Sequence, residues 1–297
     1  MKELLNCNLC PRKCGVNRIN GEVGFCGASD KLKVARAALH MWEEPCISGK
    51  NGSGTVFFSH CSLKCIFCQN SDISQVNFGK EIPTHRLAEI FIELQNKNAN
   101  NINLVTPTHY VPQIIEAIKL AKNNGLIIPI VYNSSGYENV ETIKLLNGFI
   151  DIYLPDFKYY DNELAKNLSK ASNYYSSALN AIDEMLKQID ENIFDENGIM
   201  KKGIIIRHLI LPGHTLDSKK IIKELITRYK NKVYISLMNQ YTPIKNLPYS
   251  ELNRKLSNTE YNRVVDYAIS LGLTNGFIQD GETAKESFIP KFDITGV

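Results

Sequence analysis

The sequence lacks the features that would assign the chain to a membrane, to secretion or to nucleic acid. None of its 297 residues belong to an apolar run near the roughly 20 residues of a membrane span. The first ten, MKELLNCNLC, contain no apolar signal-peptide segment. The net charge is only +3, from 34 basic and 31 acidic residues, and no block of one sign stands out. We therefore expect a cytoplasmic protein that binds neither membranes nor nucleic acid.

Cysteine, by contrast, is present in two groups. Cytosolic proteins rarely form disulfides, so eight cysteines in this chain favour metal binding. The segment CSLKCIFC contains Cys61, Cys65 and Cys68, with the spacing C-x3-C-x2-C. The other group, with the spacing C-x2-C-x3-C-x11-C, is Cys7, Cys10, Cys14 and Cys26. Cys46 stands alone, and we interpret it as a buried thiol.

Apolar strand-like segments alternate with amphipathic helical segments from residue 54 onward. Because parallel strands are buried on both faces, this pattern predicts an α/β fold, a partial (β/α)6 barrel with its helices outside. We expect a Cys-rich metal-binding extension over 1–53 and one domain over 54–297, with the barrel at about 54–240 and a C-terminal helical extension after it. Ser257 and Glu260 form a capping box that predicts a helix start in this extension. The predicted strands are 54–59, 101–106, 126–133, 149–158, 203–213 and 232–240.

Polar residues at the ends of these strands indicate one site, because the C-terminal strand ends of such barrels meet at a common mouth. Thr106, Asn133, Asp156 and Arg207 are predicted to line it. Asp156 and Lys158 flank Phe157, so both point to one face of an extended strand. They either bind a ligand or form a structural salt bridge. Arg207 lies in an apolar strand and must be paired, with a ligand carboxylate or in a core ion pair.

Three thiolates leave a metal or cluster one ligand short, which is typical of a catalytic site. A zinc site completed by His60 or another residue is one interpretation. The motif, directly after the first predicted strand and with Phe67 before its last cysteine, closely resembles the signature of the radical SAM superfamily. The resemblance implies a [4Fe–4S] cluster on Cys61, Cys65 and Cys68, whose fourth iron chelates S-adenosylmethionine (SAM). Reduction then releases a 5′-deoxyadenosyl radical that abstracts hydrogen from a substrate.

The resemblance also implies residues that contact SAM. On the segments that match the superfamily, these cofactor-binding residues are Phe67, Thr106, Thr108, Asn133, Asp156, Lys158 and Arg207. His109 and Tyr110, after the second predicted strand, are candidates for contact with the substrate, whereas His208 is expected to pack inside the protein.

Longer segments resemble the branch of enzymes that is similar to pyruvate formate-lyase activating enzyme, and within it the PflX group. These segments include NSSGY (133–137), DIYLPDFK (151–158) and IRHLILPG (206–213), together with the Cys-rich head and HMWEEPCISG (40–49). The superfamily's Gly-Gly-Glu-Pro-like segment is absent, and VTPTHY (105–110) takes its place. Asn133 stands where the activating enzymes tend to have an acidic residue. The resemblance implies a peptide or protein substrate, a glycyl radical as product, and flavodoxin or ferredoxin as electron donor.

Two other functions fit the same residues. One is a radical SAM enzyme that acts on a small molecule, and the other is a non-catalytic zinc or iron–sulfur binding module.

The N-terminal cysteines predict a second metal centre, either zinc or an auxiliary [4Fe–4S] cluster. Residues 1–30 contain few large apolar groups, so burial alone cannot offset an ordering entropy of roughly 1–2 kcal/mol per residue. A four-thiolate centre supplies on the order of 10 kcal/mol of folding free energy.

Overall fold

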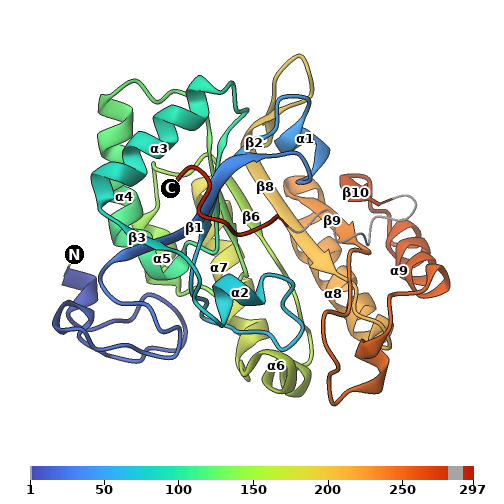
Figure 1. Cartoon of the computed structure of the whole chain (residues 1–297). Helices are drawn as coiled ribbons and strands as arrows, with labels where there is room; N and C mark the ends of the chain where they lie inside the picture. Colours follow the sequence, from blue (N-terminus) through green and yellow to red (C-terminus); the bar gives the residue numbers. More distant parts are fainter. Residues whose placement is uncertain (1, 280–289) are drawn as a thin grey trace.

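Ten strands form one mixed sheet in the computed structural model, which describes residues 2–279 and 290–297 (Figure 1). Within these residues the strand order is β10-β9-β8-β6-β5-β4-β2-β1-β3, and β7 pairs with β8 beside this path. The strands are β1 (Leu32–His40), β2 (Ser53–Phe58), β3 (Lys80–Ile82), β4 (Ile102–Val105), β5 (Ile130–Ser134), β6 (Ile152–Pro155), β7 (Ile193–Phe194), β8 (Met200–Leu209), β9 (Tyr234–Met238) and β10 (Gly276–Ile278).

The sheet confirms the predicted α/β class. Every neighbouring pair from β2 through β4, β5, β6, β8 and β9 to β10 is parallel. The six predicted strands correspond to β2, β4, β5, β6, β8 and β9. Since β3 and β10 are the two ends of the described path, the sheet is not closed into a full barrel. β1, which was not predicted, pairs antiparallel with β2 and β3.

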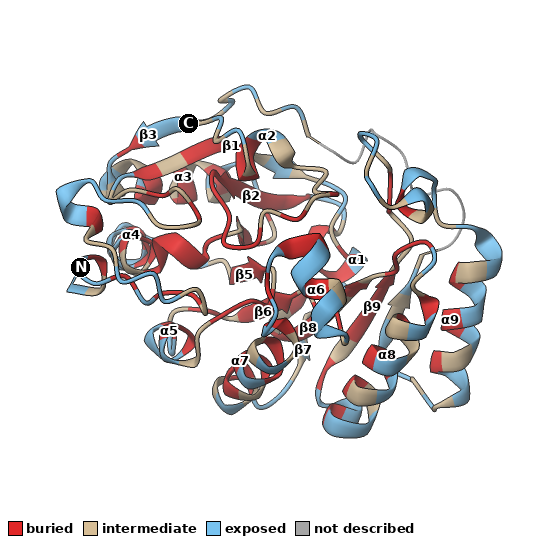
Figure 2. Ribbon diagram, turned by 90° about the horizontal axis from the view of Figure 1, so that it is seen from below, coloured by how far each residue is buried: buried red, intermediate tan, exposed pale blue. Residues whose placement is uncertain are grey.

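Helices lie along the outer side of the curved sheet, as Figure 2 shows for α4, α5, α7, α8 and α9. Neighbouring helices pack in the pairs α3 with α4, α5 with α7 and α8 with α9. No helix in the described ranges is long and apolar enough to cross a membrane. The helices are α1 (Pro45–Ser48), α2 (Ser71–Ser74), α3 (Thr84–Asn96), α4 (Val111–Asn123), α5 (Val140–Leu145), α6 (Asn162–Ser169), α7 (Tyr174–Gln188), α8 (Thr215–Tyr229) and α9 (Asn258–Ser270).

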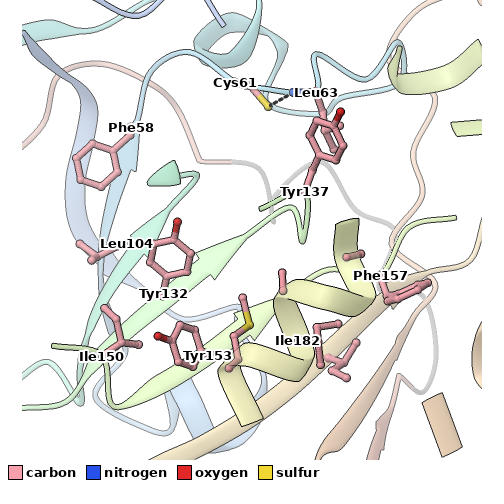
Figure 3. Close-up of a cluster of buried hydrophobic side chains, with 14 of the residues drawn as sticks. Phe58, Cys61, Leu63, Leu104, Tyr132, Tyr137, Ile150, Tyr153, Phe157 and Ile182 are labelled. Atoms are coloured by element: carbon pink, nitrogen blue, oxygen red, sulfur yellow. Dashed lines mark hydrogen bonds between the residues drawn. The ribbon is translucent and has the colours of Figure 1, made fainter. Parts of the chain in front are cut away.

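The main core fills the space between the sheet and these helices. β2, β5 and β6 are buried along their whole length, as expected for parallel strands covered on both faces. Figure 3 shows side chains from successive strands on this face of the sheet: Leu104 of β4 lies beside Tyr132 of β5, and Tyr153 of β6 lies between Tyr132 and helix α7. This packing fixes the strands relative to one another, so their C-terminal ends share one edge of the sheet.

The two ends of the described chain attach to the same part of the sheet (Figure 1). The N-terminal loops before β1 contain two short 3-10 turns, η1 (Lys2–Leu4) and η2 (Arg18–Asn20). The C-terminal residues run along β1, where the Ala37 amide donates to Thr295 O over 2.8 Å and the Ile294 amide donates to Ala35 O over 3.0 Å. The predicted C-terminal extension contains α9 and β10, and its residues 280–289 lie outside the described ranges.

Candidate active site

A cavity of about 870 Å3 opens at the C-terminal edge of the parallel strands. Its wall includes two of the motif cysteines and polar side chains from the ends of β5, β6 and β8. Its lining includes the motif cysteines Cys65 and Cys68 and the polar residues Asn133, Asp156, Lys158 and Arg207. The fold therefore brings together residues that lie far apart in the sequence.

The cysteine motif forms an irregular loop directly after β2. His60 and Lys64 both have left-handed backbone conformations, with φ of 75° and 52°. Each sulfur in the loop accepts a hydrogen bond. The Leu63 amide donates to Cys61 Sγ over 3.4 Å (Figure 3), Ser169 Oγ donates to Cys65 Sγ over 2.8 Å, and Ser74 Oγ donates to Cys68 Sγ over 3.3 Å.

The three thiols of this loop, two of which line the cavity, are a donor set that would hold an iron–sulfur cluster. Burial raises the pKa of the Cys61 thiol to about 12 and also raises the pKa of Cys68, and a bound metal would favour the thiolate form of both. The donors on the sulfurs stabilise negative charge there. In the described ranges no three His, Cys, Asp or Glu side chains are arranged to hold one metal ion.

Arg207 is the centre of a buried polar network beside the loop. The isolated bridge between Asp156 and Arg207 continues the pairing of β6 with β8 beyond the end of β6. Arg207 Nε donates to Asp156 Oδ1 over 2.9 Å, and Nη2 donates to Asn133 Oδ1 over 2.6 Å. Lys158 Nζ donates to the other Asp156 oxygen over 2.6 Å. Although burial opposes ionisation, Arg207 and Lys158 hold the pKa of Asp156 below its ordinary value.

Two acidic residues of this site, Glu43 and Glu44, were not identified from the sequence as site residues. They lie between β1 and α1 and line the cavity. Arg207 Nη1 contacts Glu43 Oε2 over 3.1 Å, so the three guanidinium nitrogens of Arg207 all have partners. Glu44 Oε2 is buried without a hydrogen-bond partner, and burial raises the pKa of Glu44. The sequence feature that could have identified them is the pair of adjacent glutamates in HMWEEPCISG.

Phe67 and Tyr241 form an aromatic part of the cavity wall. Phe67 is buried in the cysteine loop, and its ring centroid lies 5.9 Å from that of Tyr241, just after β9. Gln69 Nε2 donates to Gln240 O over 2.7 Å and ties the loop to the same strand end. The aromatic pair therefore forms the part of the cavity wall between the cysteine loop and the end of β9.

The segment after β4 does not follow the prediction. Thr106, with φ of 59°, and Thr108 are not among the described residues that line the cavity. The Thr108 hydroxyl donates to buried Glu138 over 2.7 Å, because the 3-10 turn η3 (Thr108–Tyr110) carries the chain into the core. His109 and Tyr110 are buried in the same turn, so the expectation that they contact a substrate in this cavity is wrong. His208 is buried as expected and bonds Phe157 O over 2.7 Å.

The N-terminal cysteines lie outside the cavity wall as the structure describes it. Three of them are buried, and Cys14 is exposed. The Cys7 amide donates to Val16 O over 3.0 Å, and the Gly15 amide donates back to Cys7 O over 3.0 Å. The Ala28 amide donates to Cys26 Sγ over 3.5 Å. Cys46 is buried in a separate small apolar cluster.

Comparison with known proteins adds a family and several relatives. The sequence profile described as the Radical SAM superfamily matches residues 55–226, more than half of the chain. An uncharacterised protein of Methanocaldococcus jannaschii is 34% identical over 273 residues, which cover 89% of this chain and 74% of that protein. The pyruvate formate-lyase-activating enzyme of Clostridium pasteurianum is 27% identical over 194 residues, which cover 62% of this chain and 72% of that enzyme.

Solved structures agree with these sequence matches at the level of the fold. The crystal structure of Streptococcus suis SuiB bound to S-adenosylmethionine superposes with a TM-score of 0.50 at 16% identity. A second SuiB structure gives a TM-score of 0.51 at 16% identity. The matched parts cover 74% and 77% of this chain, and in both cases 48% of the SuiB chain, so this chain spans about half the length of SuiB.

Proposed function

The chain belongs to the radical SAM superfamily, and on that premise we propose that Cys61, Cys65 and Cys68 hold a [4Fe–4S] cluster that cleaves S-adenosylmethionine. One observation carries the proposal: the three cysteines share the loop after β2, and two of them face a cavity at the C-terminal strand ends. When bound, the cluster supplies the electron that splits the sulfonium of SAM and yields a 5′-deoxyadenosyl radical able to abstract hydrogen.

The side chains around the cavity have separate roles in this proposal. Ser74 and Ser169 donate to cysteine sulfurs and so tune the potential of the cluster. Asp156 and Lys158 bind polar groups of SAM, while Arg207 holds Asp156 in position and is itself held by Asn133. Phe67, with Tyr241, excludes water from the reacting groups.

We further propose that the substrate is a peptide or a protein segment, with a glycyl radical as one product of this chemistry. Three observations support a large substrate. The cavity has a volume of about 870 Å3, and its rim includes Met41 and Trp42, which are 43% and 52% exposed. The relative from C. pasteurianum is named as an activating enzyme of pyruvate formate-lyase. In this proposal the electron comes from a small carrier such as flavodoxin or ferredoxin, as the family resemblance implies.

The reaction class can be tested without knowledge of the substrate. Purified protein is reconstituted anaerobically with iron and sulfide, then incubated with SAM and dithionite, and 5′-deoxyadenosine is measured. The parent is expected to produce it, and the Cys61→Ala, Cys65→Ala, Cys68→Ala triple variant is expected to produce none while keeping its circular dichroism spectrum. Cys46→Ala is the matched control, because it removes a buried cysteine outside both groups. Cleavage of SAM by the triple variant, or a colourless parent that binds only zinc, contradicts the proposal.

We also propose that Cys7, Cys10, Cys14 and Cys26 bind a second metal centre, either an auxiliary [4Fe–4S] cluster or zinc. Their segment has only a small apolar cluster of its own, which contains Leu4, Leu9 and Cys7. A four-thiolate centre supplies on the order of 10 kcal/mol, which such a segment needs in order to fold.

Metal analysis of the same triple variant isolates this second site. About four irons per chain indicate an auxiliary cluster, and about one zinc indicates a structural site. A variant that holds neither metal and has a protease-sensitive N-terminus contradicts the second proposal.

A further inference from the structure

The N-terminal cysteine segment is folded into one compact unit by close backbone contacts. The Lys13 amide donates to Cys10 O over 3.0 Å, and the Gly27 amide donates to Gly24 O over 3.0 Å. A Cβ atom built on Gly24 would lie only 2.5 Å from Cys14 Sγ. Glycine at this position therefore lets the chain that leads to Cys26 approach Cys14, which lies ten residues before Gly24.

Arg12 connects this unit to the catalytic cysteine loop. It lies between Cys10 and Cys14 in the sequence, and its Nε donates to Ser62 O over 3.0 Å, inside the C-x3-C-x2-C motif. Its Nη2 donates to Ser169 O over 3.1 Å, and Nη1 donates to Lys170 O. The guanidinium lies 3.9 Å from the centroid of the Phe25 ring, which holds it against its own segment.

The residues that Arg12 reaches themselves hold the motif cysteines. Ser169 Oγ is the donor to Cys65 Sγ, at 2.8 Å. The Ile66 amide donates to Leu168 O over 2.9 Å, so the last turn of α6 supports the loop from the same direction. The Arg12 guanidinium thus connects the cysteine loop to the end of α6, where Ser169 donates to Cys65 Sγ.

A second set of contacts holds the start of the loop. Buried Arg18 donates from Nη1 to His109 O over 2.6 Å, and His109 Nε2 bonds Ser59 O over 2.7 Å. A Cβ atom on Gly27, the neighbour of Cys26, would lie 3.3 Å from His60 Nδ1. The N-terminal unit therefore contacts the loop through His60, next to Cys61, and through Ser62.

The loop depends on such outside support. Two of its residues have left-handed backbone conformations, and it has no regular secondary structure between β2 and α2. Cys65 and Cys68 face the cavity, whereas no N-terminal cysteine is among the described residues of the cavity wall. The N-terminal unit consequently supports the loop on the side away from the cavity and does not contact a ligand in the cavity.

We infer that metal binding by the N-terminal cysteines orders the catalytic loop, and that Arg12 is the positioning residue that transmits this order. The inference rests on the second metal centre proposed above. A metal that fixes Cys10 and Cys14 also fixes the backbone of Arg12 between them, and with it the guanidinium that holds Ser62 and Ser169.

The test compares Arg12→Gln with Lys13→Gln, which removes the same charge one residue away. In the full-length reconstituted protein, amide hydrogen exchange of residues 59–70 and the electron paramagnetic resonance spectrum of the reduced catalytic cluster are measured. Arg12→Gln is expected to keep its N-terminal metal, speed exchange in the loop about tenfold and change the spectrum obtained with SAM, since it removes hydrogen bonds from a charged group. Arg12→Lys is expected to restore part of the protection, and Lys13→Gln to match the parent.

A Cys10→Ser, Cys14→Ser variant tests whether metal binding by the N-terminal cysteines orders the loop. It is expected to speed exchange in the loop to the same extent as Arg12→Gln, and the two changes combined are expected to add nothing further. Parent-like exchange and spectrum in Arg12→Gln overturn the inference, and so does loss of the N-terminal metal in that variant. If the parent forms no SAM-cleaving cluster, the proposed function fails, but the exchange data still decide the role of Arg12.

Discussion

Burial decides the ionisation of Glu138, which lies in the core beside β5. The residue is 1% exposed and accepts hydrogen bonds from Thr108 over 2.7 Å and from Tyr132 over 3.2 Å. Burial raises its pKa from the ordinary value of 4.5 to about 7 despite these donors. A carboxyl group whose pKa is raised in the folded state favours folding at low pH, and that contribution is lost as pH rises through about 7.

This shift predicts how stability depends on pH. For the parent, the free energy of unfolding should fall by about 2 kcal/mol between pH 5.5 and pH 8 because of Glu138 alone. Glu138→Gln cannot ionise and should remove that part of the dependence, as measured by urea unfolding at both pH values. Glu141→Gln, on the exposed side of α5, is the control and should leave the dependence unchanged. Equal pH dependence in Glu138→Gln and the parent rules out a raised pKa for Glu138.

At the scale of elements, helix α9 shows how a local signal fixes a boundary. The predicted capping box is present: Ser257 Oγ accepts from the Glu260 amide over 3.2 Å, and Glu260 Oε2 accepts from the Ser257 amide over 3.1 Å. Both contacts join residues three positions apart, so the sequence is enough to predict them. β7 and β10 were not predicted, because two or three residues are too few to show a periodic pattern.

The cap predicts a modest and local loss of stability. Ser257→Ala should lower the free energy of unfolding by about 1 kcal/mol, because the first turn of α9 loses its side-chain acceptor. Thermal unfolding measures the change, and formation of 5′-deoxyadenosine should stay at the parental level. Ser270→Ala, at the other end of the same helix, is the control and should have little effect. A Ser257→Ala protein as stable as the parent would show that packing of α9 on α8 alone determines the helix.

At the scale of the whole molecule, the C-terminal residues run along β1 beside the cavity. Phe292 packs on Phe57 of β2, with 5.5 Å between ring centroids, and Phe57 lines the cavity. Asp293 pairs with Arg36 of β1 over 2.7 Å. Together with the backbone bonds to Ala35 and Ala37, these contacts join the end of the chain to its first strand.

Removal of residues 291–297 should therefore affect stability and the cavity together. We expect the free energy of unfolding to fall by about 3 kcal/mol, since an aromatic contact and backbone hydrogen bonds are lost. Binding of a hydrophobic dye should increase as Phe57 and the edge of β1 become exposed. Removal of Val297 alone is the control and should keep most of the stability. If the truncated protein is as stable as the parent and binds no more dye, these C-terminal contacts do not stabilise β1.

The sequence by itself determined the parts of this protein that depend on neighbouring residues. Apolar runs separated by amphipathic segments predicted six parallel strands, and the motif of Cys61, Cys65 and Cys68 indicated the family through its resemblance to a known signature. Both signals are local, because periodicity and ligand spacing are read within a few turns of chain. The same patterns could not place Thr108, whose hydroxyl points to Glu138 in the core rather than to the cavity.

Only the tertiary structure decided which distant residues meet. Glu43 joins Arg207, which is 164 positions later, and Arg12 joins Ser62 and Ser169. Such contacts follow from strand order, register and the path of irregular loops, and none of these is encoded in a periodic pattern. A guanidinium or carboxylate that leaves water needs a partner, but its sequence neighbours do not say which partner the fold will supply.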